Sequence, residues 1–314
     1  MVQSKQLNEY EENFYSKVYP TSSNEAVVWG DMSTPFSISD PNGNVKGSYG
    51  LSLNMHSSVI RFVVPHDWEC PTNFSWKSIE EIPKNLVVEP GSCFREIEFI
   101  GIGDADLKSE PRLIDFITTE VQDRLEPLFD KYTLVEDGSA KDNKNASRFA
   151  TLALAERHET LRKMMNLINS TAGHSQGRPD PCHNVQKTHM SKSIRHFNQY
   201  TDFDFPQSAK EMVGFCQQNL TTLSKDNTVV HREFYYLDQD KINALEMNEN
   251  PVFRNIETGC ETPTIPGLRH GRKFHFKQVE TTNGSEHIIY ASNELETNAY
   301  ENKFLVHERF STAT

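Results

Sequence analysis

The residues with the clearest chemical potential are a histidine and a glutamate two positions apart, His231 and Glu233, in an apolar segment that runs from 229 to 237. Successive side chains of a β-strand alternate between its two faces, so this spacing puts the imidazole and the carboxylate on the same side. Two histidines and one carboxylate form the ligand set of non-haem Fe(II) oxygenases, which leaves coordination positions open. The pattern therefore predicts an Fe(II) site that needs one further histidine.

The third ligand is expected from the C-terminal region, with His275 as the first candidate. The alternatives are the other histidines of this region: His270, His287 and His307. Lys277 or Arg309 would act as the catalytic anchor for the carboxylate of an acid cosubstrate. A structural interpretation competes with this one, because H-x-E arises by chance in a chain with twelve histidines and is then an ordinary strand pair.

A second pattern, Gly173-His-Ser-Gln-Gly177, matches the nucleophile elbow G-x-S-x-G, in which a strand-to-helix turn exposes a catalytic serine. A predicted long helix precedes it where a buried strand is needed. Two prolines follow it, in Arg178-Pro-Asp-Pro181, and are predicted to prevent the helix whose N-terminus would help to bind an oxyanion. We therefore expect Ser175 to lie in a polar loop without a catalytic role.

A third pattern, Gly101-Ile-Gly103, follows a predicted strand and precedes a predicted helix, which is the usual place of a phosphate-binding loop. Asp104 and Asp106 would put carboxylates where a pyrophosphate needs backbone N–H donors. The two glycines are therefore predicted to soften a strand-to-helix connection, and no dinucleotide is expected.

The charge balance limits the classes of partner. Forty-four acidic and thirty-two basic residues give a net charge of −12 over 314 residues, a field that repels nucleic acids and anionic lipids. The densest basic segment contains Arg269, His270, Arg272, Lys273 and Lys277. It is typical of an edge strand that charge protects from aggregation, and the alternative is a phosphate or RNA contact. Nucleic acid is therefore not an expected partner.

Composition also indicates the cellular compartment. The first twenty residues lack the apolar core of a signal peptide, and no stretch has the eighteen apolar residues of a membrane-spanning helix. Five widely spaced cysteines without a C-x-x-C pair argue against disulfides and thiolate zinc sites. We expect a cytoplasmic protein with reduced thiols and no membrane segment.

Turn residues and alternating apolar positions predict strands at both ends of the chain. A hairpin is expected around Asp40-Pro-Asn-Gly43, followed by a strand over 59–64 that Pro65 ends. Near the C-terminus, Asn283-Gly284 predicts a second hairpin, followed by a strand over 303–310. With Asn283 and Gly284 as its two loop residues, this hairpin would pair Glu280 with His287, Gln278 with Ile289, and Phe276 with Ala291.

The middle third is predicted to be helical. Apolar residues recur with a helical period over 109–128, 146–168 and 206–223, whereas the residues of 169–189 are typical of a loop. These patterns favour an α+β fold with an N-terminal β-rich part, central helices and a C-terminal antiparallel sheet. A polar leader over 1–25 would precede a single domain over 26–314, and an internal boundary, if there is one, would fall in 169–190.

Two functions from different classes follow. The first is a metal-dependent oxidoreductase for a small-molecule substrate, with His231, Glu233 and His275 as the ligands of Fe(II). The second is a non-catalytic interaction or assembly protein, viral or regulatory, whose acidic surface binds a protein partner. An enzyme predicts that the metal ligands converge in a pocket, whereas an assembly protein predicts an exposed apolar patch.

Overall fold

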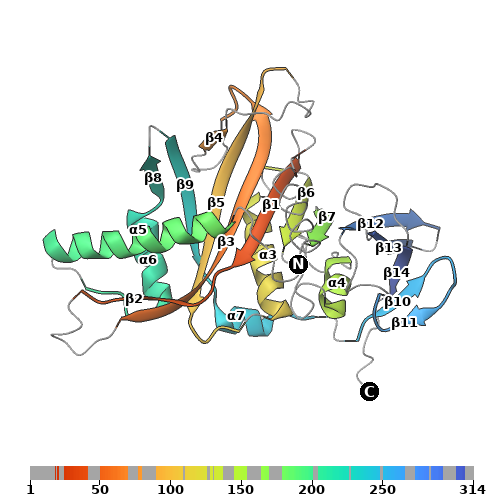
Figure 1. Cartoon of the computed structure of the whole chain (residues 1–314). Coiled ribbons are helices and arrows are strands. Elements are labelled where there is room, and N and C mark those ends of the chain that lie inside the picture. Colours follow the sequence, from red (N-terminus) through yellow and green to blue (C-terminus); the bar gives the residue numbers. More distant parts are fainter. Residues whose placement is uncertain are drawn as a thin grey trace, which may run out of the picture. The chain divides into compact units, whose positions relative to one another are not determined.

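The computed structural model of the chain has an α+β fold (Figure 1). It describes residues 18, 20, 25–41, 50–69, 77–79, 90–108, 110–125, 128–129, 131–136, 145–153, 164–169, 179–200, 204–225, 228–247, 250–265, 273–282, 284–292 and 302–307. Every structural feature given below lies in these residues.

The chain folds into two compact units, each built from segments that are far apart in the sequence. The first, which we call the β3 unit, comprises Glu12–Lys108 and Gln176–Asp240; the second, the hairpin unit, comprises Met1–Glu11, Ser109–Ser175 and Lys241–Thr314. The change of unit after Ser175 falls inside the segment 169–190. The single domain over 26–314 stays a prediction.

The β3 unit contains a sheet with the strand order β1-β3-β5-β9-β8, in which β2 pairs with β3 and β4 pairs with β5. Neighbouring strands are antiparallel except β5 and β9, which are parallel. The hairpin of β2 and β3, the end of β3 at Pro65 and the strand over 229–237 confirm sequence predictions. The strands are β1 (Glu25–Met32), β2 (Phe36–Ile38), β3 (Leu51–Pro65), β4 (Lys77–Ile79), β5 (Ser92–Asp104), β8 (Thr222–Lys225) and β9 (Thr228–Tyr236).

Two helices, α5 (Pro179–Tyr200) and α6 (Ala209–Asn219), cover one face of this sheet (Figure 1). Their apolar side chains share a core with the strands, in which Met190 and Met212 belong to the same buried cluster as Met55. Ser208 caps α6, because its side chain accepts a hydrogen bond from the backbone N–H of Glu211 at 3.2 Å. Helix α6 thus confirms the prediction over 206–223 with shorter ends.

The hairpin unit contains a sheet with the order β11-β10-β14-β13-β12-β7-β6, antiparallel except for β6 and β7. Phe149 of α4 packs on this sheet, with its ring centroid 4.5 Å from that of Phe274 and 5.9 Å from that of Phe276. The elements are α3 (Pro111–Leu125), β6 (Lys131–Glu136), α4 (Ala146–Ala153), β7 (Met164–Asn169), β10 (Val252–Asn255), β11 (Glu261–Thr262), β12 (Lys273–Thr281), β13 (Gly284–Ser292) and β14 (Asn302–His307); α7 (Gln239–Ala244) lies where the chain passes from one unit to the other.

Two predictions for the middle of the chain were wrong. The helix expected over 146–168 ends at Ala153, and 164–169 is the strand β7, because the two sheet neighbours of this apolar segment override its helical spacing. The loop expected over 169–189 contains the start of α5 at Pro179. Pro179 and Pro181 are tolerated there, because the first turn of a helix has no partner for its N–H groups.

Two details of strand structure also differ from the predictions. The C-terminal hairpin exists, but Phe276 pairs with Ile289 instead of Ala291, a shift that keeps every side chain on its expected face. Gly101 and Gly103 lie inside β5 and do not form a strand-to-helix connection. At Gly101 a Cβ atom would come within 2.7 Å of Leu237 and 2.9 Å of the Tyr235 ring, so any larger residue would require these side chains to shift.

The described cysteines and helices can be compared with what composition indicated. Cys93, Cys182 and Cys216 are buried free thiols, and Cys260 is an exposed one. Within the described part of the chain, no helix is long and apolar enough to cross a membrane.

Candidate metal centre

The first turn of α5 carries two potential metal ligands, Asp180 and His183. Side chains three positions apart are neighbours on a helix surface, so both point to the same side. Asp180 also stabilises this end of the helix, because a carboxylate complements the positive N-terminal end of the helix dipole.

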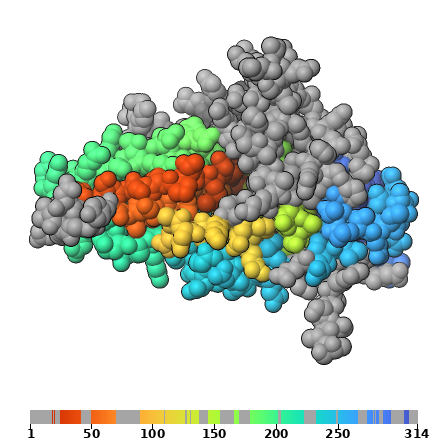
Figure 2. Space-filling view, turned by 60° about the horizontal axis from the view of Figure 1, so that its bottom comes forward, coloured from red at the N-terminus to blue at the C-terminus, as the bar shows by residue number. Residues whose placement is uncertain are grey.

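The third ligand comes from the end of β1. Asp31 lies opposite Ser57 in the register of β1 and β3. Helix α5 packs on both strands, and Figure 2 shows the side of the β3 unit on which β1 (red) lies along α5 (green). One ligand atom from each of Asp31, Asp180 and His183 lies within 4.8 Å of the other two. Two ligands of one ion lie at most about twice a metal–ligand distance apart, which is about 4 to 5 Å, so these three side chains are close enough to share an ion.

A hydrogen bond orients the imidazole of His183. Its Nε2 lies 3.2 Å from the backbone carbonyl oxygen of Asp31, and since a carbonyl can only accept, Nε2 must carry the hydrogen. The lone pair is then on Nδ1. Metal-bound histidines commonly donate their second ring N–H to a backbone carbonyl or a carboxylate in this way.

The surroundings keep His183 neutral. Burial of the ring, which is only 4% exposed, lowers its pKa from 6.5 to about 4; the positive charge of Lys187 acts in the same direction, and the hydrogen bond with Asp31 opposes it. The Lys187 ammonium donates to the carbonyl oxygen of Thr34 at 3.4 Å and lies 4.9 Å from the ring centroid of Phe36. Both aspartates are half-buried.

A further buried histidine, His56, is not part of this group. It lies opposite Met32 in the register and therefore points to the other face of the sheet from Asp31. Gly30 makes room for its ring there, because a Cβ atom at this position would lie 3.1 Å from His56 Nε2. Burial, followed by the effect of His183, lowers the pKa of His56 to about 3.

Farther along α5, the interface with the sheet is charged but balanced. Arg232 Nε, next to α5, donates to Glu98 at 2.7 Å. Within the sheet, Arg61 of β3 donates through Nη2 to Glu96, its partner in the register of β5, at 3.0 Å. Gln186 of α5 can accept from Arg232 when its amide oxygen faces the guanidinium. Two acids and two bases cancel, so we interpret this layer as structural.

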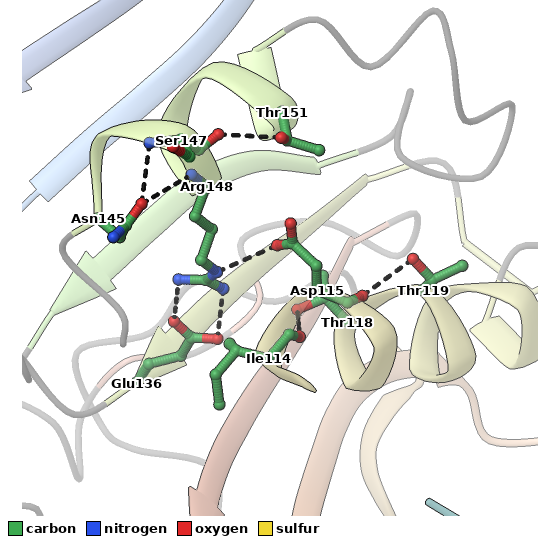
Figure 3. A network of polar contacts seen from close by, with 9 residues as sticks. All are labelled: Ile114, Asp115, Thr118, Thr119, Glu136, Asn145, Ser147, Arg148 and Thr151. Carbon is green, nitrogen blue, oxygen red and sulfur yellow. Dashed lines mark hydrogen bonds and ion pairs between the residues drawn. The ribbon is translucent and has the colours of Figure 1, made fainter. Parts of the chain in front are cut away.

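A second polar network lies in the hairpin unit around Arg148, which is fully buried (Figure 3). Its guanidinium donates to both carboxylate oxygens of Glu136, at 2.7 and 2.8 Å, while its Nε lies 3.3 Å from Asp115. Asn145 caps α4 by accepting from the backbone N–H groups of Ser147 and Arg148. One cation thus serves two buried carboxylates.

The excess of negative charge in this network is reflected in the pKa of Asp115. Burial raises the pKa of its carboxyl from 3.8 to about 7; Arg148 opposes the rise, and Glu136 adds to it. Asp115 is only 5% exposed, so solvent screens the interactions of its carboxyl group little. We interpret the network as a packing element of the hairpin unit that holds a proton near neutral pH.

The predicted His231, Glu233 and His275 belong to different units. His231 and Glu233 lie in β9 of the β3 unit, where Glu233 is half-buried and opposite Phe99, on the face away from Arg232. The side chain of His231 lies outside the described residues. His275 lies in β12 of the hairpin unit, with its Nδ1 3.1 Å from Asn166 Oδ1. The Fe(II) triad therefore stays a prediction.

The structure describes only some of the other predicted site residues. Lys277 is exposed on β12, opposite Ile288, and the half-buried His287 lies on β13. Arg309 and His270 lie outside the described residues, as do the side chain of His307 and the serine of the G-x-S-x-G pattern. Of the basic segment, Lys273 and Lys277 are described.

Sequence reasoning missed Asp31, Asp180 and His183. The available signal was the Asp-x-x-His spacing of the last two, which becomes meaningful once Pro179 and Pro181 are taken as a helix start. Asp31 has no such signal, because it precedes His183 by 152 positions.

No protein-family model, curated protein or solved structure that we compared with this chain is significantly similar to it.

Proposed function

We propose that this protein binds a divalent metal ion between β1 and α5, through Asp31, Asp180 and His183. The observation that carries the proposal is the convergence of two carboxylates and a neutral imidazole on one point, from segments 152 positions apart in the chain. Among the described histidine, cysteine and acidic side chains, these three lie close enough together to bind one ion.

Charge supports binding of a divalent cation. Asp31 and Asp180 together contribute two negative charges, and His183 is neutral because its burial holds the pKa near 4. Two close carboxylates repel each other in a partly buried site, and a divalent ion would cancel that repulsion. Oxygen ligands with one imidazole suit Mn²⁺, Fe²⁺ and Zn²⁺ better than Ca²⁺, which is bound mainly by oxygen.

Metal binding to the full chain tests the proposal. We expect isothermal titration with MnCl₂ or ZnCl₂ to show one ion per chain, and Asp180→Asn to lower the affinity by about tenfold or more, since even residues behind a metal ligand commonly contribute that much. Asp180 is half-buried at the start of a helix, so the conservative amide leaves the packing intact. Asp106→Asn, at an exposed position of the same unit, is the matched control and should bind as the wild type does.

A wild-type chain that binds no divalent ion, or an Asp180→Asn variant that binds it with unchanged affinity, would refute this proposal. The oxidoreductase prediction concerns other ligands and needs its own variant. Iron content that is equal in the wild type and in a His231→Ala, Glu233→Ala double variant would remove the Fe(II) site at those residues. The two substitutions at β9 should leave manganese binding at Asp180 unchanged.

The described residues offer no specific support for the assembly protein. Val185, Tyr200 and Ile256 are the large apolar side chains that are exposed there, and Ile256 belongs to a different unit from the other two. Single exposed apolar residues are usual on monomeric proteins. We therefore do not propose a docking function.

A further inference from the structure

The residues around the metal group do more than supply three ligands, because their charges do not cancel once an ion is bound. Asp31 and Asp180 balance a divalent ion, and His183 adds no charge. Lys187 then remains as a positive charge one helical turn after His183, so it lies on the same side of α5 as that imidazole. Its ammonium donates to the carbonyl oxygen of Thr34, three positions after Asp31. Counted over these four described side chains, the occupied group therefore carries an excess of one positive charge.

The three described ligands do not fill the coordination shell of a transition-metal ion. Mn²⁺, Zn²⁺ and their neighbours take four to six ligands, about one to three more than this group supplies. Among the residues that the structure describes, no fourth histidine, cysteine or acidic side chain joins the group. His56 is excluded because the register of β1 and β3 turns it to the other face of the sheet.

Solvent can reach the open positions. Asp31 and Asp180 are half-buried, so solvent reaches part of this group, whereas His183 is buried. Lys187 is also half-buried, and its ammonium contacts the carbonyl oxygen of Thr34 and the ring of Phe36. These contacts fix the position of the Lys187 ammonium on the side of α5 that carries the proposed metal ligands.

From these observations, and resting on the proposed function, we infer that the metal centre takes an anionic oxygen ligand, a carboxylate or a phosphate, in an open coordination position beside Lys187. The ion would bind one oxygen of the anion, and the positive charge of Lys187 would favour a negative ligand over water. Arrangements of a metal with a nearby cation are suited to this recognition because both charges attract the same group.

Cobalt absorption tests the inference on the full chain. Co²⁺ replaces other first-row ions in such sites, and its visible spectrum depends on the ligands that it holds. We expect a protein-dependent spectrum with Co²⁺ alone, and a saturable change of that spectrum on addition of sodium phosphate or sodium acetate. Separate titrations with the two salts distinguish a phosphate site from a carboxylate site.

The variant Lys187→Gln should move two affinities in opposite directions. Removing this positive charge should tighten Co²⁺ binding and weaken anion binding, each by about threefold or more, which is the effect of one unit charge about one helical turn away even at the dielectric constant of water. A merely structural role for Lys187 would lower both. Lys192→Gln, at an exposed position of the same helix, is the control and should leave both affinities unchanged.

The outcomes separate the two proposals. A chain without a protein-dependent cobalt spectrum refutes the metal site itself, and the anion site with it. A cobalt spectrum that neither phosphate nor acetate changes overturns the anion site and leaves the metal site standing. An anion affinity that is equal in the wild type and in Lys187→Gln also overturns the inference, because the charge beside the ion would then select nothing.

Discussion

The protonation of Asp115 gives a quantitative prediction. Its carboxyl shares one guanidinium with Glu136, and the bidentate contact of Arg148 goes to Glu136, so Asp115 keeps only a 3.3 Å contact with Arg148 Nε (Figure 3). The perturbation that we consider is Asp115→Asn. An amide has the same shape, is neutral at every pH, and can still accept from Nε through its oxygen.

The sign of the effect follows from the raised pKa. With a native pKa of about 7 and an ordinary value of 3.8, the folded chain holds a proton on Asp115 over a range in which the unfolded chain has lost it. The free energy of unfolding of the wild type therefore falls as the pH rises through this range. At roughly 1.4 kcal/mol per pH unit, the full loss is about 4 kcal/mol, of which about 3 kcal/mol falls between pH 5 and pH 8.

Urea unfolding followed by far-ultraviolet circular dichroism at pH 5, 6, 7 and 8 measures this loss. The quantity of interest is the difference between Asp115→Asn and the wild type, because other titrating groups cancel in it. We expect the variant to gain about 3 kcal/mol relative to the wild type over this range. Glu120→Gln on the same helix is the control, since its partly exposed ion pair with Arg124 is worth at most about 1 kcal/mol.

One result would refute this reasoning. If the difference between Asp115→Asn and the wild type stays constant within about 0.5 kcal/mol from pH 5 to pH 8, then Asp115 is ionised throughout, and Arg148 neutralises both carboxylates.

Two further predictions concern packing and thiol reactivity. Gly101→Ala should destabilise the protein by about 1–3 kcal/mol in thermal unfolding, because its Cβ atom would lie 2.9 Å from the ring of Tyr235. Gly214→Ala, in a helix with open space around the new methyl group, should instead stabilise by about 0.5–1 kcal/mol, and equal effects of the two substitutions would contradict the packing argument. A thiol reagent with peptide mapping should label Cys260 in the native chain and Cys182 only after unfolding, because burial raises the pKa of the Cys182 thiol; rapid native labelling of Cys182 would contradict this.

Local sequence was sufficient to predict strands in which apolar and polar residues alternate, and helices whose ends have clear capping or proline signals. The hairpin of β2 and β3, the end of β3 at Pro65, and the helix α3 were predicted within a few residues. Each depends on neighbours in the chain, such as a turn residue, a missing N–H group or a helical period. Interactions of this kind are local, so a single sequence carries them.

Tertiary neighbours decided the elements that local patterns described wrongly. The segment 164–169 has apolar residues that suit a helix or a strand, and the strands beside it made it β7. Asn283-Gly284 predicted a hairpin, but the pairing of β12 with β13 shifted, because the register depends on contacts along the whole ribbon.

The candidate site divides in the same way. Asp180 and His183 carry a local signal, their spacing on a helix that two prolines begin, and this could have been found from the sequence. Asp31 carries none, because its approach to His183 closes a loop of 152 positions and depends on how α5 packs against β1 and β3. A metal site made of one strand and one helix is a property of that packing, since only folding brings its ligands within reach of one ion.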